Sequence, residues 1–183
     1  GRDRPAGVAA PRMRTVVRNA KILVAEPENY DARAEVMWAG SLSHNGLTGC
    51  GTDGGDWATH QLEHEIGALF DVAHGAGLAA VWGSWARYVY KENPARFAQF
   101  ATEVMGLQPA ATDEETALAG IAAMEEFYRE LKMPVTIREL GIEPTGAQLK
   151  EMAEKCASKF ENGVGTMKKL SAEDMEKIFR AAM

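Results

Sequence analysis

The chain has 183 residues, of which 46% are hydrophobic and 25% are charged. This composition is ordinary for a globular protein and allows one domain with a sizeable core. The formal net charge of −6 and the lack of a Lys/Arg stripe exclude a nucleic-acid-binding surface. No apolar run approaches the length that crosses a bilayer, so no membrane partner is expected.

The two cysteines, Cys50 and Cys156, are far apart and form no CxxC pattern. They are predicted to be free thiols in a reducing compartment, and a cytoplasmic location is expected. Residues 1–13 contain two prolines and no apolar core segment, so they are not a secretory signal. We expect a linker or an irregular start there, and Gly1 in place of Met suggests a cut point.

Apolar residues recur at helical spacing over the rest of the chain, and no stretch alternates with period two for long. The pattern predicts an all-α helical bundle without repeats, forming one domain over residues 14–183. The predicted helices, in chain order, are 14–25, 30–47, 57–70, 78–91, 94–105, 113–131, 137–140, 146–157 and 171–182.

Local signals mark some helix ends and some packing. Asp56 is predicted to cap the helix over 57–70, and Ser171 with Asp174 forms a capping box at the last helix. The helix over 30–47 carries small residues that predict close packing against neighbouring elements: Ala34, Ala39, Gly40 and Ser41.

A glycine-rich loop over residues 46–55 formally matches GxGxxG between Gly49 and Gly54. A dinucleotide fingerprint requires a preceding β-strand and a following helix inside a βαβ unit. Here the preceding segment is predicted to be helical. We therefore do not expect this loop to bind a nucleotide.

Three of the four histidines, His60, His64 and His74, lie close together in the sequence. His60 and His64 are four residues apart and project from one face of a helix. His74 would lie about 21 Å beyond His60 on an unbroken helix, too far to share a metal ion. The segment from Asp71 to Gly75 can supply a break, with Gly75 and Gly77 easing the backbone path.

Other interpretations of these histidines stay open. They could fall together by chance, on a helix surface or in a core. His60-Gln-Leu-Glu63-His64 also matches H-x-x-E-H, in which two histidines bind zinc and the glutamate is the general base of an inverted zincin protease. That mechanism leaves His74 unexplained. His44 is predicted to be a surface or packing residue.

A longer pattern is more specific. Asp56-Trp-Ala-Thr-His60-x3-His64-x9-His74-Gly75 follows Tyr30-Asp-Ala-Arg-Ala-Glu-Val-Met-Trp-Ala-Gly-Ser-Leu-Ser-His-Asn-Gly46. Together the two segments strongly resemble the iron-dependent alcohol dehydrogenase family, within it the butanol dehydrogenases and broad aldehyde reductases. The resemblance runs from about Thr15 to the C-terminus and thus covers nearly the whole chain.

The resemblance implies an N-terminal Rossmann-like domain that binds NAD or NADP, followed by a helical domain that holds one divalent metal, Fe²⁺ or Zn²⁺. The family's ligands are an aspartate and three histidines, and two of these histidines match His60 and His74. The other two ligands come earlier, on a helix that this sequence lacks. His64 matches a histidine that lines the cleft near the nicotinamide, so it is expected to be catalytic and cofactor-binding. Glu63 matches a position that the family varies, so Glu63→Gln should cost a dehydrogenase little.

The implied reaction is hydride transfer between NAD(P) and a small alcohol or aldehyde whose oxygen the metal polarises. Asp71 or a backbone carbonyl is expected to orient a ligand histidine. The full-length parent is expected to be a homodimer. This chain would be its C-terminal half, and because two ligands hold a metal weakly, the isolated fragment could be inactive.

Overall fold

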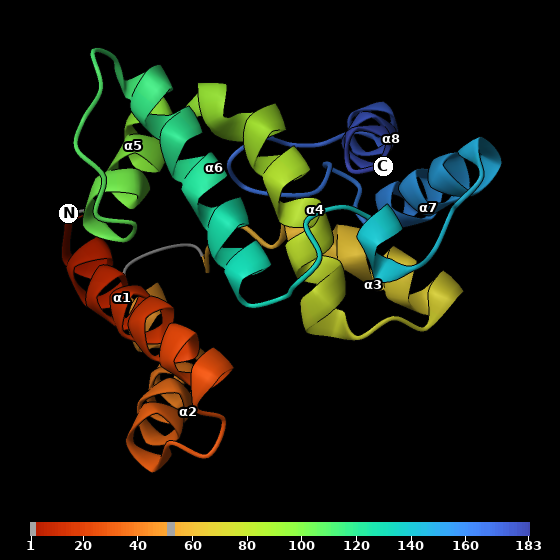
Figure 1. Cartoon of the computed structure of the whole chain (residues 1–183). Coiled ribbons are helices and arrows are strands. Elements are labelled where there is room, and N and C mark those ends of the chain that lie inside the picture. The colour runs from red at the N-terminus through yellow and green to blue at the C-terminus, as the bar shows by residue number, and fades with distance from the viewer. Residues whose placement is uncertain (1–2, 51–53) are drawn as a thin grey trace.

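The structure, a computed structural model, describes residues 3–50 and 54–183, with the backbone alone over residues 3–6. In these ranges the chain forms eight α-helices and no strand, apart from one isolated bridge between Val164 and Leu170, which confirms the all-α prediction (Figure 1). The helices are α1 (Asp3–Ala25), α2 (Tyr30–His44), α3 (Ala58–Phe70), α4 (His74–Val89), α5 (Pro94–Glu103), α6 (Asp113–Glu130), α7 (Gly146–Ser158) and α8 (Ala172–Ala181). Short 3₁₀ turns lie at Leu47–Gly49, Tyr90–Glu92 and Arg138–Leu140.

Helix α4 lies at the centre of the core and packs against α3, α6 and α8 (Figure 1). Its Val81 and Val89 are fully buried, as are Leu62 and Ile66 of α3. These apolar side chains recur at helical spacing, so each helix presents one face to the core. The same contact between α3 and α4 positions the histidines described below.

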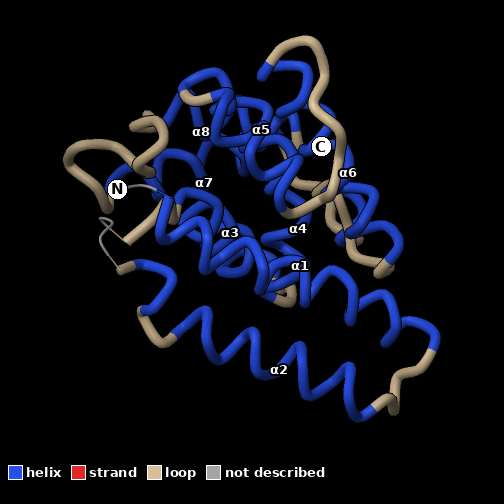
Figure 2. The backbone as a smooth tube through the Cα atoms, turned by 90° about the vertical axis from the view of Figure 1, so that its left-hand side faces the viewer, coloured by secondary structure: helices blue, strands red, loops and turns tan. Residues whose placement is uncertain are grey.

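Helices α1 and α2 lie side by side and extend away from the other six (Figures 1 and 2). Lys21 of α1 forms an ion pair with Glu130 of α6 at 2.5 Å. Only Ala32 and Ala39 of α2 are buried, and Trp38 is 65% exposed. The predicted close packing was therefore wrong for three of its four residues, which are exposed: Ala34, Gly40 and Ser41. The reason is tertiary, because α2 packs mainly on α1 and the 3₁₀ turn Leu47–Gly49.

The predicted linker or irregular start over 1–13 also differs from the structure, because α1 extends back to Asp3. Pro5 falls in the first turn, where a helix needs no N–H donor. Pro11 lies inside the helix, where its carbonyl accepts a hydrogen bond from the Thr15 hydroxyl at 3.1 Å and the neighbouring Ala10 is buried. The division of the chain into domains stays a prediction.

Helix ends follow local signals. Ser171 and Asp174 form the predicted capping box, with the Ser171 N–H donating to the Asp174 carboxylate at 2.9 Å. Helix α2 ends at His44 and not at Leu47, because Gly46 has a φ of 83°.

The segment before the glycine-rich loop is helical, as predicted, although residues 51–53 of the GxGxxG match lie outside the described residues. No helix in the described part of the chain is long and apolar enough to cross a membrane.

The two cysteines are free thiols, as predicted: Cys50 is exposed and Cys156 is buried. Burial in the core, with a smaller contribution from Glu65, raises the pKa of Cys156 to about 11. The thiolate is the reactive form of cysteine. Cys156 is therefore both inaccessible and protonated at neutral pH.

A thiol reagent such as Ellman's reagent is expected to label Cys50 rapidly and Cys156 only after unfolding. Counting labelled thiols in native protein and in guanidinium checks this. In the matched variant Cys50→Ser, no thiol should react before unfolding. Two rapidly reacting thiols in the native wild type would contradict the buried, protonated state of Cys156.

Candidate metal centre

The start of α3 is held by Asp56. One carboxylate oxygen, Oδ1, accepts a hydrogen bond from the Ala58 N–H at 2.8 Å, although the N-cap of α3 is Trp57 and not Asp56 as predicted. The other oxygen accepts from the N–H groups of Thr166 at 2.8 Å and Met167 at 2.7 Å. Asp56 thus ties the first residue of α3 to a distant loop.

The predicted break between the histidines is present. Helix α3 ends at Phe70, Asp71 adopts a left-handed conformation with a φ of 52°, and α4 begins at His74. Asp71 supplies this turn itself, because Gly75 and Gly77, expected to ease the path, are ordinary residues of α4 without positive φ. Asp tolerates the left-handed region because its short polar side chain bonds locally.

The turn brings the three imidazoles together. The ring centroid of His74 lies 5.4 Å from that of His60 and 5.5 Å from that of His64. The structure thus places all three predicted site histidines at one corner between α3 and α4. Helical spacing alone accounts for the pair on α3, and the chain reversal adds the third.

His60 is half-buried, and the edge of the Trp57 ring packs against it with centroids 4.7 Å apart. Its buried Nδ1 has no hydrogen-bond partner among the described residues. Burial, followed by the nearby His74 and His64, lowers the pKa of His60 below its ordinary value of 6.5. His44, exposed at the end of α2 as predicted, adds a further small lowering. His60 is therefore held in the neutral form that can bind a metal.

Glu63 makes a contact that the sequence analysis did not predict. Its carboxylate is hydrogen-bonded to Nδ1 of His74, and its side chain is 2% exposed against 51% for His74. The sequence suggested Asp71 as the orienting carboxylate, but Asp71 is exposed and caps α3. The resemblance had assigned Glu63 no role in a dehydrogenase.

The arrangement fits a divalent metal ion. Potential ligand atoms of Glu63, His64 and His74 lie within 4.8 Å of one another, and His60 adjoins them with an unpaired nitrogen. Imidazole suits both Fe²⁺ and Zn²⁺. Which of these side chains coordinate stays a prediction, with His60 and His74 as the expected pair and His64 outside it.

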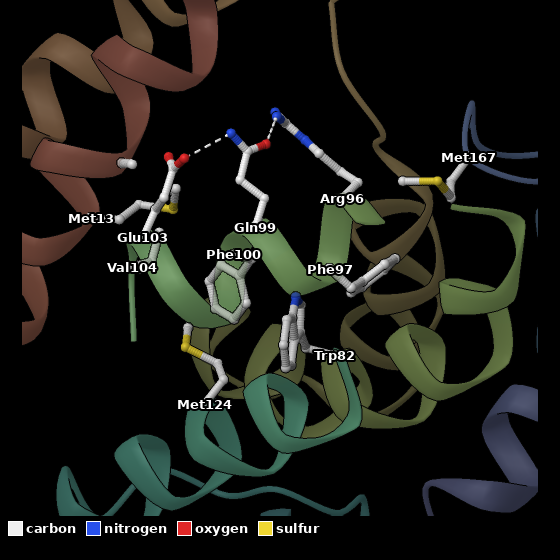
Figure 3. Close-up of a pocket in the computed structure, with 11 residues that line it drawn as sticks. Met13, Trp82, Arg96, Phe97, Gln99, Phe100, Glu103, Val104, Met124 and Met167 are labelled. Atoms are coloured by element: carbon white, nitrogen blue, oxygen red, sulfur yellow. Dashed lines mark hydrogen bonds between the residues drawn. The ribbon is translucent and has the colours of Figure 1, made fainter. Parts of the chain in front are cut away.

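A separate apolar pocket of about 290 Å³ lies beside α5 (Figure 3). The rings of Trp82, Phe97 and Phe100 line it, and its lining residues include no histidine. At its rim Gln99 bonds Arg96 at 2.8 Å and Glu103 at 3.0 Å. This pocket offers no metal-binding cluster and is not part of the histidine site.

Fold and side chains together define an all-α domain with a candidate metal centre. Residues 6–183 match the C-terminal part of the Fe-containing alcohol dehydrogenase family, and the chain belongs to this family. This confirms the resemblance inferred from the spaced histidines and the segment over residues 30–46.

Several relatives support the assignment. The chain is 36% identical over 173 residues to the probable NADH-dependent butanol dehydrogenase 1 of Bacillus subtilis, covering 93% of this chain and 43% of that protein. It is 30% identical over 168 residues to the NADPH-dependent aldehyde reductase YqhD of Escherichia coli, with 92% and 42% covered. The crystal structure of NADH-dependent butanol dehydrogenase A from Thermotoga maritima superposes with a TM-score of 0.89 at 31% identity, covering 97% of this chain and 46% of that one. The chain thus spans less than half the length of these relatives.

The lowered pKa of His60 makes stability depend on pH. As pH falls through 6.5, the unfolded chain binds a proton that the folded His60 resists, so the free energy of unfolding decreases. Urea denaturation of metal-free protein between about pH 8 and about pH 5 should show a larger loss for the wild type than for His60→Gln. The exposed-site control His44→Gln should follow the wild type. Identical losses in the wild type and His60→Gln would contradict the prediction.

Proposed function

We propose that this chain is the helical part of a metal-dependent alcohol dehydrogenase or aldehyde reductase, in which His60 and His74 bind the metal and His64 lines the cleft near the nicotinamide. The observation that carries the proposal is the convergence of three imidazoles at the corner between α3 and α4, one with an unpaired buried nitrogen. Membership of the Fe-containing alcohol dehydrogenase family supports the same reaction class.

Each site residue has a distinct task in this proposal. His60, kept neutral by burial, and His74, fixed through Glu63, present nitrogen ligands. A bound Fe²⁺ or Zn²⁺ would supply Lewis acidity to the oxygen of a primary alcohol or aldehyde. His64, on the exposed side of the cluster, is free to contact the substrate or the nicotinamide, which exchange the hydride.

Two protein ligands are too few for a catalytic metal site, which uses at least three. The proposed activity therefore belongs to a full-length parent that adds the remaining ligands and the NAD(P)-binding domain. The names of the relatives include both NADH and NADPH, and the proposal covers either nucleotide. A homodimeric assembly and a cytoplasmic location remain part of it. The isolated chain is expected to be inactive.

The protease alternative has less support. A general base must reach the metal-bound water, whereas the carboxylate of Glu63 is buried and bonded to His74. H-x-x-E-H also makes no use of His74, which the structure places against both other histidines. The geometry and the family therefore both favour the dehydrogenase.

In the full-length parent, His60→Ala or His74→Ala is expected to lose both bound metal and alcohol oxidation, because the remaining ligands hold the ion poorly. His64→Ala should keep the metal while lowering turnover or cofactor affinity. Metal content per chain and steady-state kinetics measure both effects.

His44→Ala is the matched control and should change neither quantity, since His44 is exposed at the end of α2. A metal-free His64→Ala together with a fully loaded His74→Ala would overturn the assignment. The pair would then be His60 with His64, as in the protease motif.

A further inference from the structure

One nitrogen of His74 is occupied by a protein partner. Nδ1 is hydrogen-bonded to the Glu63 carboxylate, so Nε2 is the nitrogen left for any ligand. An ionised carboxylate can only accept hydrogen bonds, so Nδ1 carries the imidazole proton when its partner Glu63 is ionised. In a neutral ring this leaves the lone pair on Nε2, which is the form that coordinates a metal.

The carboxylate of Glu63 lies in a slot made by two glycines. A Cβ added to Gly77 of α4 would lie 2.7 Å from Cγ and 2.8 Å from Oε1 of Glu63. A Cβ added to Gly67, one turn along α3, would lie 3.2 Å from Oε1. A side chain at position 77 would displace the glutamate, whereas one at position 67 would require only a small shift of its carboxylate. The two backbones thus leave room for a buried carboxylate beside the histidines.

Burying a carboxylate is costly unless it is paired. The Glu63 side chain is 2% exposed. Its side-chain partner is the imidazole of His74, the first residue of α4. His74 is half-exposed and follows a turn, so it would lose more rotamer freedom on binding a metal without this anchor.

We infer that Glu63 is the positioning residue of the metal centre: it fixes His74 in the Nδ1–H tautomer and aims Nε2 at the ion. This inference rests on the proposed function for the identity of the ligand. The tautomer itself does not depend on it. Carboxylates that hold metal-binding histidines in this way typically contribute about 10- to 100-fold to metal affinity.

Long-range ¹H–¹⁵N correlation spectra of the metal-free chain at about pH 8 report the tautomer of each histidine. His74, assigned by the loss of its signals in His74→Gln, is expected to be protonated on Nδ1. A solvated imidazole prefers Nε2–H, so this result requires the bond to Glu63. Finding His74 protonated on Nε2 in the wild type would overturn the inference, whatever the variants do.

Variants then separate positioning from folding. Glu63→Leu keeps the bulk, removes the acceptor and should return His74 to the Nε2–H tautomer, whereas Glu63→Gln retains an acceptor oxygen and should largely keep Nδ1–H. Glu65→Leu is the matched control: Glu65 is buried on the same helix and pairs with Lys159, so its loss should leave the His74 tautomer unchanged. A shift of the tautomer in Glu65→Leu as large as that in Glu63→Leu would contradict a specific role for Glu63.

Titration with Zn²⁺ completes the test. Zn²⁺ affinity is expected to fall about 10- to 100-fold in Glu63→Leu and much less in Glu63→Gln. Equal affinity in wild type and Glu63→Leu, or coordination of His74 through Nδ1, would overturn the inference. A different outcome separates the two proposals. If the Nδ1–H tautomer of His74 depends on Glu63 but the full-length parent binds no divalent metal, the proposed function is refuted. The positioning of His74 by Glu63 then still holds.

Discussion

The close approach of α3 and α4 around the Glu63 carboxylate is the contact on which the rest of the structure depends. Gly77 makes it possible, because any side chain there would collide with Glu63. The same two helices bury the central apolar residues, and α4 also packs against α6 and α8. Core and candidate site therefore share one interface, so a change that separates the helices disturbs both.

Helix positions were predictable because each helix has an apolar face that recurs at helical spacing. The start of α8 was predictable because a local group, the Ser171 and Asp174 capping box, determines it. The exposure of α2 was not, because small residues indicate only that a neighbour could approach. Whether one does depends on tertiary structure, and α2 packs mainly on α1.

The site was partly predictable for a related reason. Four-residue spacing places His60 and His64 on one face, and the need for a chain reversal before His74 could be stated from helix geometry. The bond between Glu63 and His74 was not predicted, because the short motif suggested a different role for Glu63. A usable signal for a buried Glu63 side chain was Gly67. It lies one turn after Glu63 and leaves room for that side chain along α3. Gly77 gave no such signal, since its distance from Glu63 is determined by the turn at Asp71.

Burial changes in steps across the cluster, and each step matches a chemical requirement. Glu63 is fully buried, where a carboxylate keeps its partner because water cannot compete. His60 is half-buried, which disfavours its charged form. His74 and His64 are exposed on the outer side of the cluster. A more buried cluster would be closed to solvent, and a fully solvated one would leave His74 free to rotate. The corner between two helices satisfies both requirements because its inner side belongs to the core.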